Sequence, residues 1–437
     1  MPTAPACPPP TAAPASTLRP GDYAALIGLD WGDGKHAIAL RACTAGSRVE
    51  KSLLEHSAEN LHAWLEQLGE RFNHQPVAIA LESSKGAVVS ALCEYPWVVI
   101  YPIHPSTSRR FSTAFTPSGA KDDTPDALVL LEILEGHRHR LRPLVGQEGQ
   151  TRRVALLVEA RRKLVDRRTL LTNTMQSLLK NYYPQALDLV GDTLHSPLSL
   201  DFLARWPELA LLKRTKAQTL RDFYHQHQVR RADAVTKRLA ILEQARPLSG
   251  DRDLCEVSVL QLAALVAEVR TVNAYLRKAE KAISAAFEAH PDAAIFGSLP
   301  GAGAAMAPRL CVLFGVNRDR WSNAGEMQKY YGVAPVIERS GKQRLVHWRW
   351  NAPRFARQSL VEWAGQSVKA SCRWAKAYYE QQSQRGKGHS AIMRALAFKW
   401  LRILWRCWKE RKPYDDALYL AQLHKKKAPF LAFLPAT

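Results

Sequence analysis

The stretch Ala24-Ala-Leu-Ile-Gly-Leu-Asp30-Trp31 is a short apolar run that ends in an acid, and it predicts a buried strand. The glycine-containing turn Gly32-Asp-Gly34 follows it and leads into a second apolar run, residues 36–40. Beyond these, the pattern predicts helices at 57–72 and 87–94 and apolar strands at 77–81 and 97–101. Apolar strands that alternate with helices indicate an α/β sheet with both faces covered.

An acid follows each of two predicted strands, Asp30 after the first and Glu82 after residues 77–81. Ligands of α/β sheets gather at the carboxyl ends of the strands. One acid at such a place is typically a solvated strand-end residue. Two of them, together with a further pair of acids downstream, predict a set of carboxylates that meets at one sheet edge.

The downstream pair lies in Gly119-Ala-Lys-Asp-Asp-Thr-Pro-Asp-Ala127, the predicted start of a helix with Thr124 as its cap. Asp123 and Asp126 are three residues apart and therefore share one helix face. Two like charges so placed repel each other, and a divalent metal or a basic partner would relieve that repulsion. The alternative interpretation, which the cluster alone leaves open, is that the helix dipole favours acids at this end.

The charge of the chain is strongly asymmetric. Its 61 Lys and Arg residues exceed its 40 Asp and Glu residues, which gives a formal net charge of +21. Residues 1–147 hold 13 basic and 15 acidic side chains, so the whole excess lies in residues 148–437. This division predicts an acidic catalytic module followed by a region that binds a polyanion.

The sequence predicts a soluble, cytoplasmic protein. Its seven cysteines are scattered, without zinc-ligand spacing, which is typical of free thiols in a reducing compartment. Residues 1–22 are rich in proline and alanine and predict a disordered tail and no signal peptide. No apolar run approaches the length of a membrane span.

Residues 150–290 have a helical pattern with two apolar stripes. Leucines recur every seven residues at 157, 164, 171 and 178, and a second stripe runs from Leu262 to Ile283. Both stripes predict packing surfaces. An intramolecular core and a coiled coil between two copies of the chain are left open as interpretations.

Two further motifs lie in residues 291–437, which hold 25 basic and 9 acidic side chains. Leu299-Pro-Gly301-Ala-Gly303 resembles the hairpin of a helix-hairpin-helix module, whose glycines let backbone N–H groups approach a phosphate, although a plain helix turn has the same pattern. Ser340-Gly341 lies in a basic loop, and a turn is the simplest interpretation of that pair. Cations near these motifs and tryptophans among them are candidates for phosphate and base contacts: Arg339, Lys342, Arg344, Trp348 and Arg349.

In this order, the motifs around Gly28-Leu-Asp30-Trp, Glu82, Lys121-Asp-Asp123-Thr-Pro-Asp126, Leu299–Gly303 and Tyr331-Gly-Val-Ala-Pro to Ser340-Gly341 resemble the Piv-type DEDD transposases of insertion sequences. The resemblance covers residues 23 to 415. It implies an α/β RNase H-like (RuvC-like) domain, a long helical, coiled-coil-like region and a mainly α C-terminal transposase domain. The corresponding boundaries are a disordered tail at 1–22, the RuvC-like domain at 23–147, a helical linker and oligomerisation region at 148–290, the transposase domain at 291–415 and a basic tail at 416–437.

The resemblance also implies a chemistry. Asp30, Glu82, Asp123 and Asp126 would be the DEDD acids that hold Mg²⁺, and Ser340 would be the nucleophile that forms a transient serine–DNA phosphodiester. The implied partners are the DNA of element ends and target, a structured noncoding guide RNA and further copies of the chain in a dimer or tetramer, acting in a bacterial-type cytoplasm at the nucleoid. One departure concerns Asp122, which stands where the family usually has Thr or Ser, so Asp122 could share the role of Asp123.

Two other functions fit the same residues. A RuvC-like junction-resolving nuclease would keep the acids and use water in place of Ser340. A nucleic-acid-binding protein without enzymatic activity would use the basic residues alone, with the acids as helix-capping and strand-end residues.

Overall fold

The computed structural model describes residues 23–115, 123–144, 149–341, 343–370 and 372–434, and the chain divides into two compact units, residues 1–146 and 147–437. The predicted disordered tail, Asp122 and Lys342 lie outside the described residues. Within the described part, no helix is both long and apolar enough to cross a membrane.

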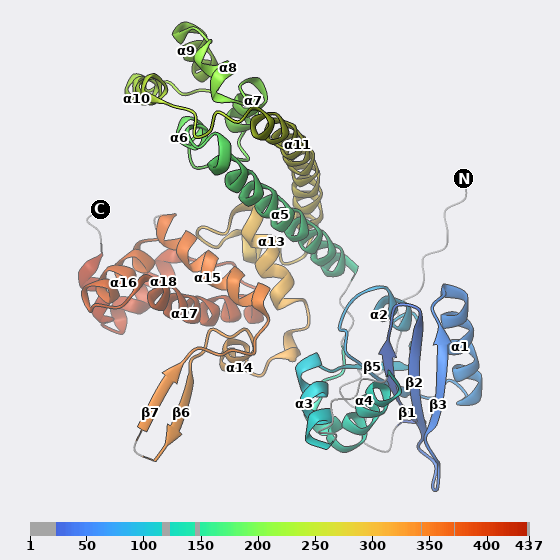
Figure 1. Ribbon diagram of the computed structural model, residues 1–437. Coiled ribbons are helices and arrows are strands. Elements are labelled where there is room, and N and C mark those ends of the chain that lie inside the picture. Colours follow the sequence, from blue (N-terminus) through green and yellow to red (C-terminus); the bar gives the residue numbers. More distant parts are fainter. Residues whose placement is uncertain (1–22, 116–122, 145–148, 342, 371, 435–437) are drawn as a thin grey trace, which may run out of the picture. The chain divides into compact units, whose positions relative to one another are not determined.

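A five-stranded mixed sheet forms the centre of the first unit (Figure 1). β1 pairs antiparallel with β2 and parallel with β4, and β4 pairs parallel with β5. Three antiparallel strands followed by two parallel ones, with helices on both faces, form the RNase H-like fold, so the predicted fold class is confirmed. The strands, in the spatial order β3-β2-β1-β4-β5, are β1 (Ala25–Trp31), β2 (Lys35–Ala42), β3 (Glu50–Glu55), β4 (Val77–Leu81) and β5 (Val98–Pro102).

Each face of this sheet is covered by its own helices. On one face, Ile27 and Leu29 of β1 belong to the core that α1 (Ala58–Arg71) and α2 (Ala87–Leu92) complete. On the other face, α4 (Asp123–His137) packs on the small side chains of β2 and β4, with α3 (Pro105–Phe115) beside it. Because side chains alternate along a strand, the even-numbered residues of β1 face α4.

The second unit begins with a long pair of helices, α5 (Gly149–Tyr182) and α11 (Arg252–Glu288). Arg161 pairs with Glu280, whereas Arg167 pairs with Glu268, so the two helices run antiparallel. Leucines of the two predicted stripes, such as Leu171 and Leu262, are buried in the core at one end of this pair. The stripes therefore serve intramolecular packing.

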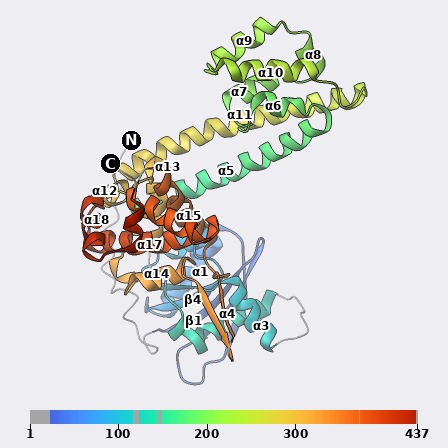
Figure 2. The ribbon, with the colours of Figure 1, turned by 90° about the vertical axis from the view of Figure 1, so that its left-hand side faces the viewer.

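Five short helices close the end of this pair (Figure 2). Their core is rich in aromatic rings, and Phe202 lies within 6.3 Å, centroid to centroid, of three others. The helices are α6 (Gln185–Val190), α7 (Pro197–Arg205), α8 (Leu209–Lys213), α9 (Ala217–Gln226) and α10 (Ala232–Gln244).

The C-terminal part of the second unit is a helical bundle with one β-ribbon. Trp363, Trp374, Trp400 and Trp408 are fully buried in its core, so these tryptophans pack helices together. Residues 416–434, predicted as a basic tail, form ordered structure, and Leu423 and Phe430 join the same core. The elements are α12 (Ala293–Gly297), α13 (Gly303–Phe314), α14 (Ala324–Tyr330), β6 (Val336–Ser340), β7 (Gln343–His347), α15 (Arg354–Lys369), α16 (Arg373–Gln384), α17 (His389–Glu410), α18 (Asp416–Lys425) and the 3₁₀ turn Pro429–Phe433.

Candidate active site

Two strand-end acids of the first unit lie at neighbouring positions on the sheet. Gly28 of β1 is paired with Ala80 of the parallel strand β4, so Asp30 and Glu82 each lie two residues further along. Residues two apart on a strand share a face. Asp30 therefore lies on the side of Gly28 that α4 covers, and Glu82 lies beside it at the carboxyl end of the next strand, as the sequence predicts.

The side chain of Glu82 is oriented by α3. Ser108, which is buried on that helix, donates a hydrogen bond from its hydroxyl to Glu82 Oε1. Since α3 packs beside α4, this contact holds the Glu82 carboxylate on the α4 side of the sheet. Ser108 is a supporting residue that sequence analysis missed, and nothing in the local pattern around it distinguishes it from other helix serines.

A close backbone contact brings the start of α4 to the same place. A Cβ on Gly28 would lie 2.0 Å from the carbonyl oxygen of Ala127 and 2.7 Å from the amide nitrogen of Leu131. Glycine is therefore required here, because α4 crosses β1 backbone to backbone. Asp126, which is exposed, directly precedes Ala127, so the first turn of α4 lies near Gly28, two residues before Asp30.

Asp123 is the first residue of α4, but its side chain lies outside the described part of the structure. Among the side chains that are described, no three His, Cys, Asp or Glu residues are grouped closely enough to hold a metal ion. Asp30, Glu82 and Asp126 belong to the described side chains and form no such group, so their role as metal ligands stays a prediction. An all-oxygen set suits a hard cation such as Mg²⁺, and like charges on one face would be relieved by it.

A pair of histidines lies at the same end of the sheet, and sequence analysis did not predict it. His36 is fully buried, its ring stacks on Trp31 at 3.5 Å between centroids, and its Nε2 lies 3.0 Å from Nδ1 of His56. Burial lowers the pKa of His36, and the neighbouring His56 lowers it further. The neutral imidazole is therefore the favoured form beside the strand that carries Asp30.

Ser340 lies on an exposed two-stranded ribbon in the second unit. It is the last residue of β6 and is paired with Gln343 of β7, and Gly341 follows it with φ of 55°. The pairing places Ser340 on the same face of the ribbon as Glu338 and Leu345. A serine hydroxyl at this position is open to a large substrate.

Two of the predicted phosphate-binding cations lie on the other face of the ribbon. Arg339 and Arg344 are paired with each other and lie on the opposite face, together with the exposed Ile337 and Val346. On the Ser340 face, Glu338 accepts a hydrogen bond from His347 Nε2 at 2.9 Å. This contact, aided by the carbonyl of Trp348, raises the pKa of His347.

The predicted helix-hairpin-helix glycines differ in their surroundings. A Cβ on Gly301 would lie 2.6 Å from the carbonyl carbon of Gln366, so Gly301 lets the turn pack against the backbone of α15. Gly303 is exposed at the start of α13 and has nothing within 4 Å of an added Cβ. Phosphate contact at these two positions stays a prediction, and Gly303 is the one that a ligand can reach.

Trp348 and Arg349 follow the ribbon and approach the bundle. Arg357 of α15 lies over the Trp348 ring at 4.4 Å and donates a hydrogen bond to the carbonyl oxygen of Arg349 at 2.8 Å. Trp348 keeps 41% of its surface exposed, in contrast to the buried tryptophans of the bundle core. It is therefore available to a ligand.

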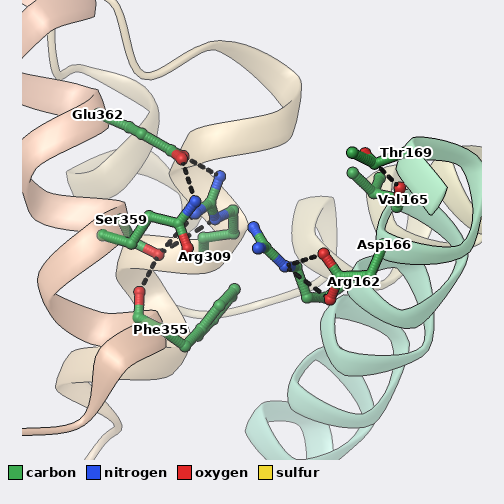
Figure 3. A network of polar contacts seen from close by, with 9 residues as sticks. Arg162, Val165, Asp166, Thr169, Arg309, Phe355, Ser359 and Glu362 are labelled. Carbon is green, nitrogen blue, oxygen red and sulfur yellow. Dashed lines mark hydrogen bonds and ion pairs between the residues drawn. The ribbon is translucent and has the colours of Figure 1, made fainter. Parts of the chain in front are cut away.

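A largely buried arginine, whose side chain is 12% exposed, fixes α15 against α13 (Figure 3). Arg309 donates to Glu362 Oε2 at 2.8 Å and to the hydroxyl of Ser359 at 2.8 Å. Arg162 of α5 points towards it and is itself paired with Asp166. Burial lowers the pKa of Arg309, and the Glu362 carboxylate opposes that shift.

Comparisons with known proteins agree with the order of these motifs. Residues 27–184 match a family model described as a transposase, of the DEDD type of IS110. Residues 293–380 match the model of the transposase IS116/IS110/IS902 family. The two matched segments contain the acids of the first unit and Ser340 of the second.

Three relatives from insertion elements are similar along much of the chain. The proposed transposase of the IS117 mini-circle of Streptomyces coelicolor is 28% identical over 407 residues, which cover 91% of this chain and 97% of that protein. The 43.6 kDa protein of insertion element IS110, from the same organism, is 25% identical over 402 residues, with the same coverage. The 42 kDa protein of IS900 of Mycobacterium paratuberculosis is 24% identical over 305 residues, 68% of this chain and 73% of that one.

Among solved structures, T. thermophilus RuvC in complex with a Holliday junction substrate matches 28% of this chain and 100% of its own, at 15% identity and a TM-score of 0.21. That TM-score is too low to establish structural equivalence. The assignment therefore rests on the family models and the insertion-element relatives. They show that this protein belongs to the IS110/IS116/IS902 family of insertion-element transposases.

Proposed function

We propose that this protein cuts and rejoins DNA strands at the ends of an insertion element, through a transient phosphodiester between Ser340 and DNA. The observation that best supports the proposal is the register of β1 and β4, which brings Asp30 and Glu82 to the same end of the sheet. Family membership and the basic second unit support DNA as the substrate.

Asp30, Glu82, Asp123 and Asp126 would hold Mg²⁺, since all four offer carboxylate oxygens. When bound, the ions would supply charge stabilisation at the reacting phosphate. The protein's own residues do the positioning: Gly28 admits α4 to the strand, and Ser108 orients Glu82. Asp122 lies outside the described residues, and Asp123 remains the preferred ligand because of its three-residue spacing to Asp126.

The covalent step would begin at the exposed Ser340 hydroxyl. A bond forms between Ser340 Oγ and phosphorus, the bond from phosphorus to one deoxyribose oxygen breaks, the serine releases its proton and the leaving oxygen gains one. The DNA strand stays joined to the protein until a hydroxyl of another strand attacks the same phosphorus and releases the serine. Strand exchange thus needs no external energy source.

A structured noncoding RNA would direct this reaction, and a dimer or tetramer would perform it. The positive net charge of residues 148–437 is large enough to attract two nucleic-acid ligands. Because Ser340 and the acids lie in different units, a composite site could be assembled from two copies of the chain.

The test uses purified protein, Mg²⁺, end-labelled element-end DNA and the transcript of the flanking DNA, resolved on a denaturing protein gel. We expect a labelled protein band with the wild type and none with Ser340→Ala. Ser322→Ala, which alters another exposed serine of the same unit, should keep the band. A band of unchanged intensity with Ser340→Ala would refute the serine mechanism. Omitting the transcript tests whether the reaction requires the RNA.

One observation favours a second candidate, a junction nuclease that uses water. Arg339 and Arg344 lie on the face of the ribbon opposite Ser340, so they do not flank its hydroxyl. In the same assay this candidate predicts nicked DNA and no labelled protein band. The Ser340→Ala variant would then cleave DNA at the wild-type rate.

A further inference from the structure

A cavity of about 640 Å³ lies in the C-terminal bundle and is lined by residues of α15, α16 and α17. Its volume falls within the range of roughly 300–1,000 Å³ that is usual for small-molecule sites. Val361, Val368 and Met393 give it an apolar floor. Trp348 and Tyr379 add aromatic walls, so a flat apolar group is one part of what the cavity can hold.

The charges around the cavity are almost all positive. The one acid among the lining residues, Glu362, already accepts hydrogen bonds from Arg309 at 2.8 Å and from Gln358 at 2.6 Å. Its charge is therefore compensated from within the bundle, and the cationic side chains face the cavity without a lining acid to neutralise them. These are Arg354, Arg357, Lys369, Arg394 and, when protonated, His389.

Trp348 joins the aromatic and cationic parts of the cavity. It lies at the foot of the ribbon, with Arg357 of α15 at 4.4 Å and Arg394 of α17 at 6.0 Å from its ring centroid. Two guanidinium groups beside a half-exposed indole favour a ligand that carries both a flat ring and an anion. In a protein that acts on nucleic acid, that ligand is a nucleotide.

We propose that this cavity binds one unstacked nucleotide of a nucleic-acid strand, with the base against Trp348 and the phosphate among Arg354, Arg357 and Arg394. The inference rests on the proposed function, which supplies nucleic acid as the ligand. A base inside a continuous duplex cannot enter, because its faces are covered by its neighbours. The cavity therefore recognises a single-stranded or displaced segment.

The cavity positions a strand and does not take part in its cleavage. Ser340 lies at the far end of β6, and five residues of strand span about 16 Å. A nucleotide held at the foot of the ribbon would thus fix the strand several nucleotides from the phosphate that reacts with Ser340. Loss of the cavity contact should alter which DNA is bound and where it is cut, without removing the nucleophile.

The test measures binding of the full-length protein by fluorescence anisotropy at one fixed salt concentration. The probes are a labelled 20-base-pair DNA duplex, the same duplex with one unpaired adenine, and single strands of DNA and RNA of that sequence. We expect the wild type to bind the unpaired adenine and the single strands more tightly than the duplex. Trp348→Ala should reduce that preference by about fivefold to a hundredfold, the range for loss of one stacked base, and leave duplex binding unchanged.

Matched variants separate this role from general effects. Trp350→Ala removes a neighbouring tryptophan that is 68% exposed and does not line the cavity, and it should keep the preference. Arg394→Gln should weaken it, whereas Arg402→Gln on the same helix should not. A second readout replaces the unpaired adenine with 2-aminopurine, whose fluorescence should be quenched by the wild type and Trp348→Phe and unquenched with Trp348→Ala.

Two results would overturn the proposal that the cavity binds a nucleotide. One is equal affinity of the wild type for all probes, and the other is a loss of the preference with Trp350→Ala as large as that with Trp348→Ala. A preference confined to DNA or to RNA would identify which strand the cavity takes. Binding is measured without strand cleavage, so these outcomes are independent of Ser340. Absence of a labelled protein band in the cleavage assay would instead count against the serine mechanism and leave the cavity intact.

Discussion

The sheet end of the first unit and the ribbon of the second unit carry the two candidate sets of reacting groups, and they are built in opposite ways. Asp30 lies near the end of the largely buried β1, and Glu82 follows β4, whose residues are all buried. Ser108 of α3 contacts Glu82, and α4 packs on Gly28 of β1. Ser340 lies on β6 of the two-stranded ribbon, whose side chains are mostly exposed. Leu345 and Val346 of β7, for example, keep 61% and 56% of their surface exposed.

This difference teaches how the two sets would be used. A sheet with helices on both faces fixes the direction of its carboxylates before any ligand arrives. A two-stranded ribbon has little stability of its own, and the exposed apolar residues on this ribbon would be covered by a ligand or a second copy. We infer that the acids are preorganised and that the serine reaches its working position on assembly with nucleic acid.

The largest expected effect is on cleavage, from loss of a carboxylate charge at the sheet end. Asp30→Asn and Glu82→Gln should each lower the rate of strand cleavage by at least about 100-fold, the scale for removing one electrostatic contact to a reacting group. Their thermal unfolding should match that of the wild type, because neither acid is part of the core. The measurement is the initial rate of nicking of element-end DNA.

Asp33→Asn is the matched control for the acids, since Asp33 is an exposed acid in the turn after β1. It should cleave at the wild-type rate. Full activity of Asp30→Asn and Glu82→Gln would remove the sheet end from the chemistry and leave the ribbon as the only candidate. It would favour the interpretation of these acids as ordinary strand-end residues.

The next effect is on stability, and it compares a glycine of each region. Gly28→Ala places a methyl group against the backbone of α4, so β1 and α4 must separate. Overpacking of this kind costs about 1–3 kcal/mol of unfolding free energy, and more where neither backbone yields. We expect the melting temperature of the first unit to fall by several degrees in calorimetry, and cleavage to fall because α4 carries Asp123 and Asp126.

Gly341→Ala supplies the contrast on the ribbon. Its added methyl group meets nothing within 4 Å, although its φ of 55° costs about 1 kcal/mol for a residue other than glycine. That strain should stay local to the ribbon and leave the melting temperature nearly unchanged. A smaller loss from Gly28→Ala than from Gly341→Ala would contradict the preorganised sheet end.

The sequence predicted the sheet end better than the ribbon, for physical reasons. The apolar runs of β1 and β4 are buried on both faces, and such runs identify strands and hence the acids that follow them. The strand β3 was missed because Glu50–Glu55 is a mostly exposed edge with no apolar run. The need for glycine at Gly28 depends on where α4 crosses the sheet, which local sequence does not contain.

On the ribbon, the decisive information is the pairing register. Arg339 precedes Ser340 on the same strand and therefore faces away from it in any register, whereas a shift of one residue would bring Arg344 to the face of Ser340. Nothing in the basic sequence of the loop fixes that register. The tryptophans give the same lesson. Trp348 and Trp400 have similar cationic neighbours in sequence, yet one is half-exposed beside a cavity and the other is fully buried.

Two histidines extend the contrast to pH. His36 is buried at the sheet end, where burial and His56 lower its pKa, whereas His347 lies on the ribbon, where the hydrogen bond to Glu338 raises its pKa. A lowered pKa means that folding favours the neutral ring, so this stabilisation is present above about pH 6.5 and is lost as the pH falls. A raised pKa has the opposite sign: the stabilisation is present below about pH 6.5 and is lost as the pH rises.

The smallest expected effect is therefore a difference between two pH profiles of thermal unfolding, measured from about pH 5 to pH 8. Relative to the wild type, His36→Phe removes a group that resists protonation, so the first unit of this variant should lose less stability on acidification. His347→Gln should be slightly less stable than the wild type at low pH and equal to it at high pH, and the gap should stay small because the ribbon is exposed. Parallel profiles for wild type and His36→Phe would show that the buried imidazole is not held neutral by the fold. A large loss with His347→Gln would show that the ribbon is as firmly built as the sheet end, and the comparison between the two regions would fail.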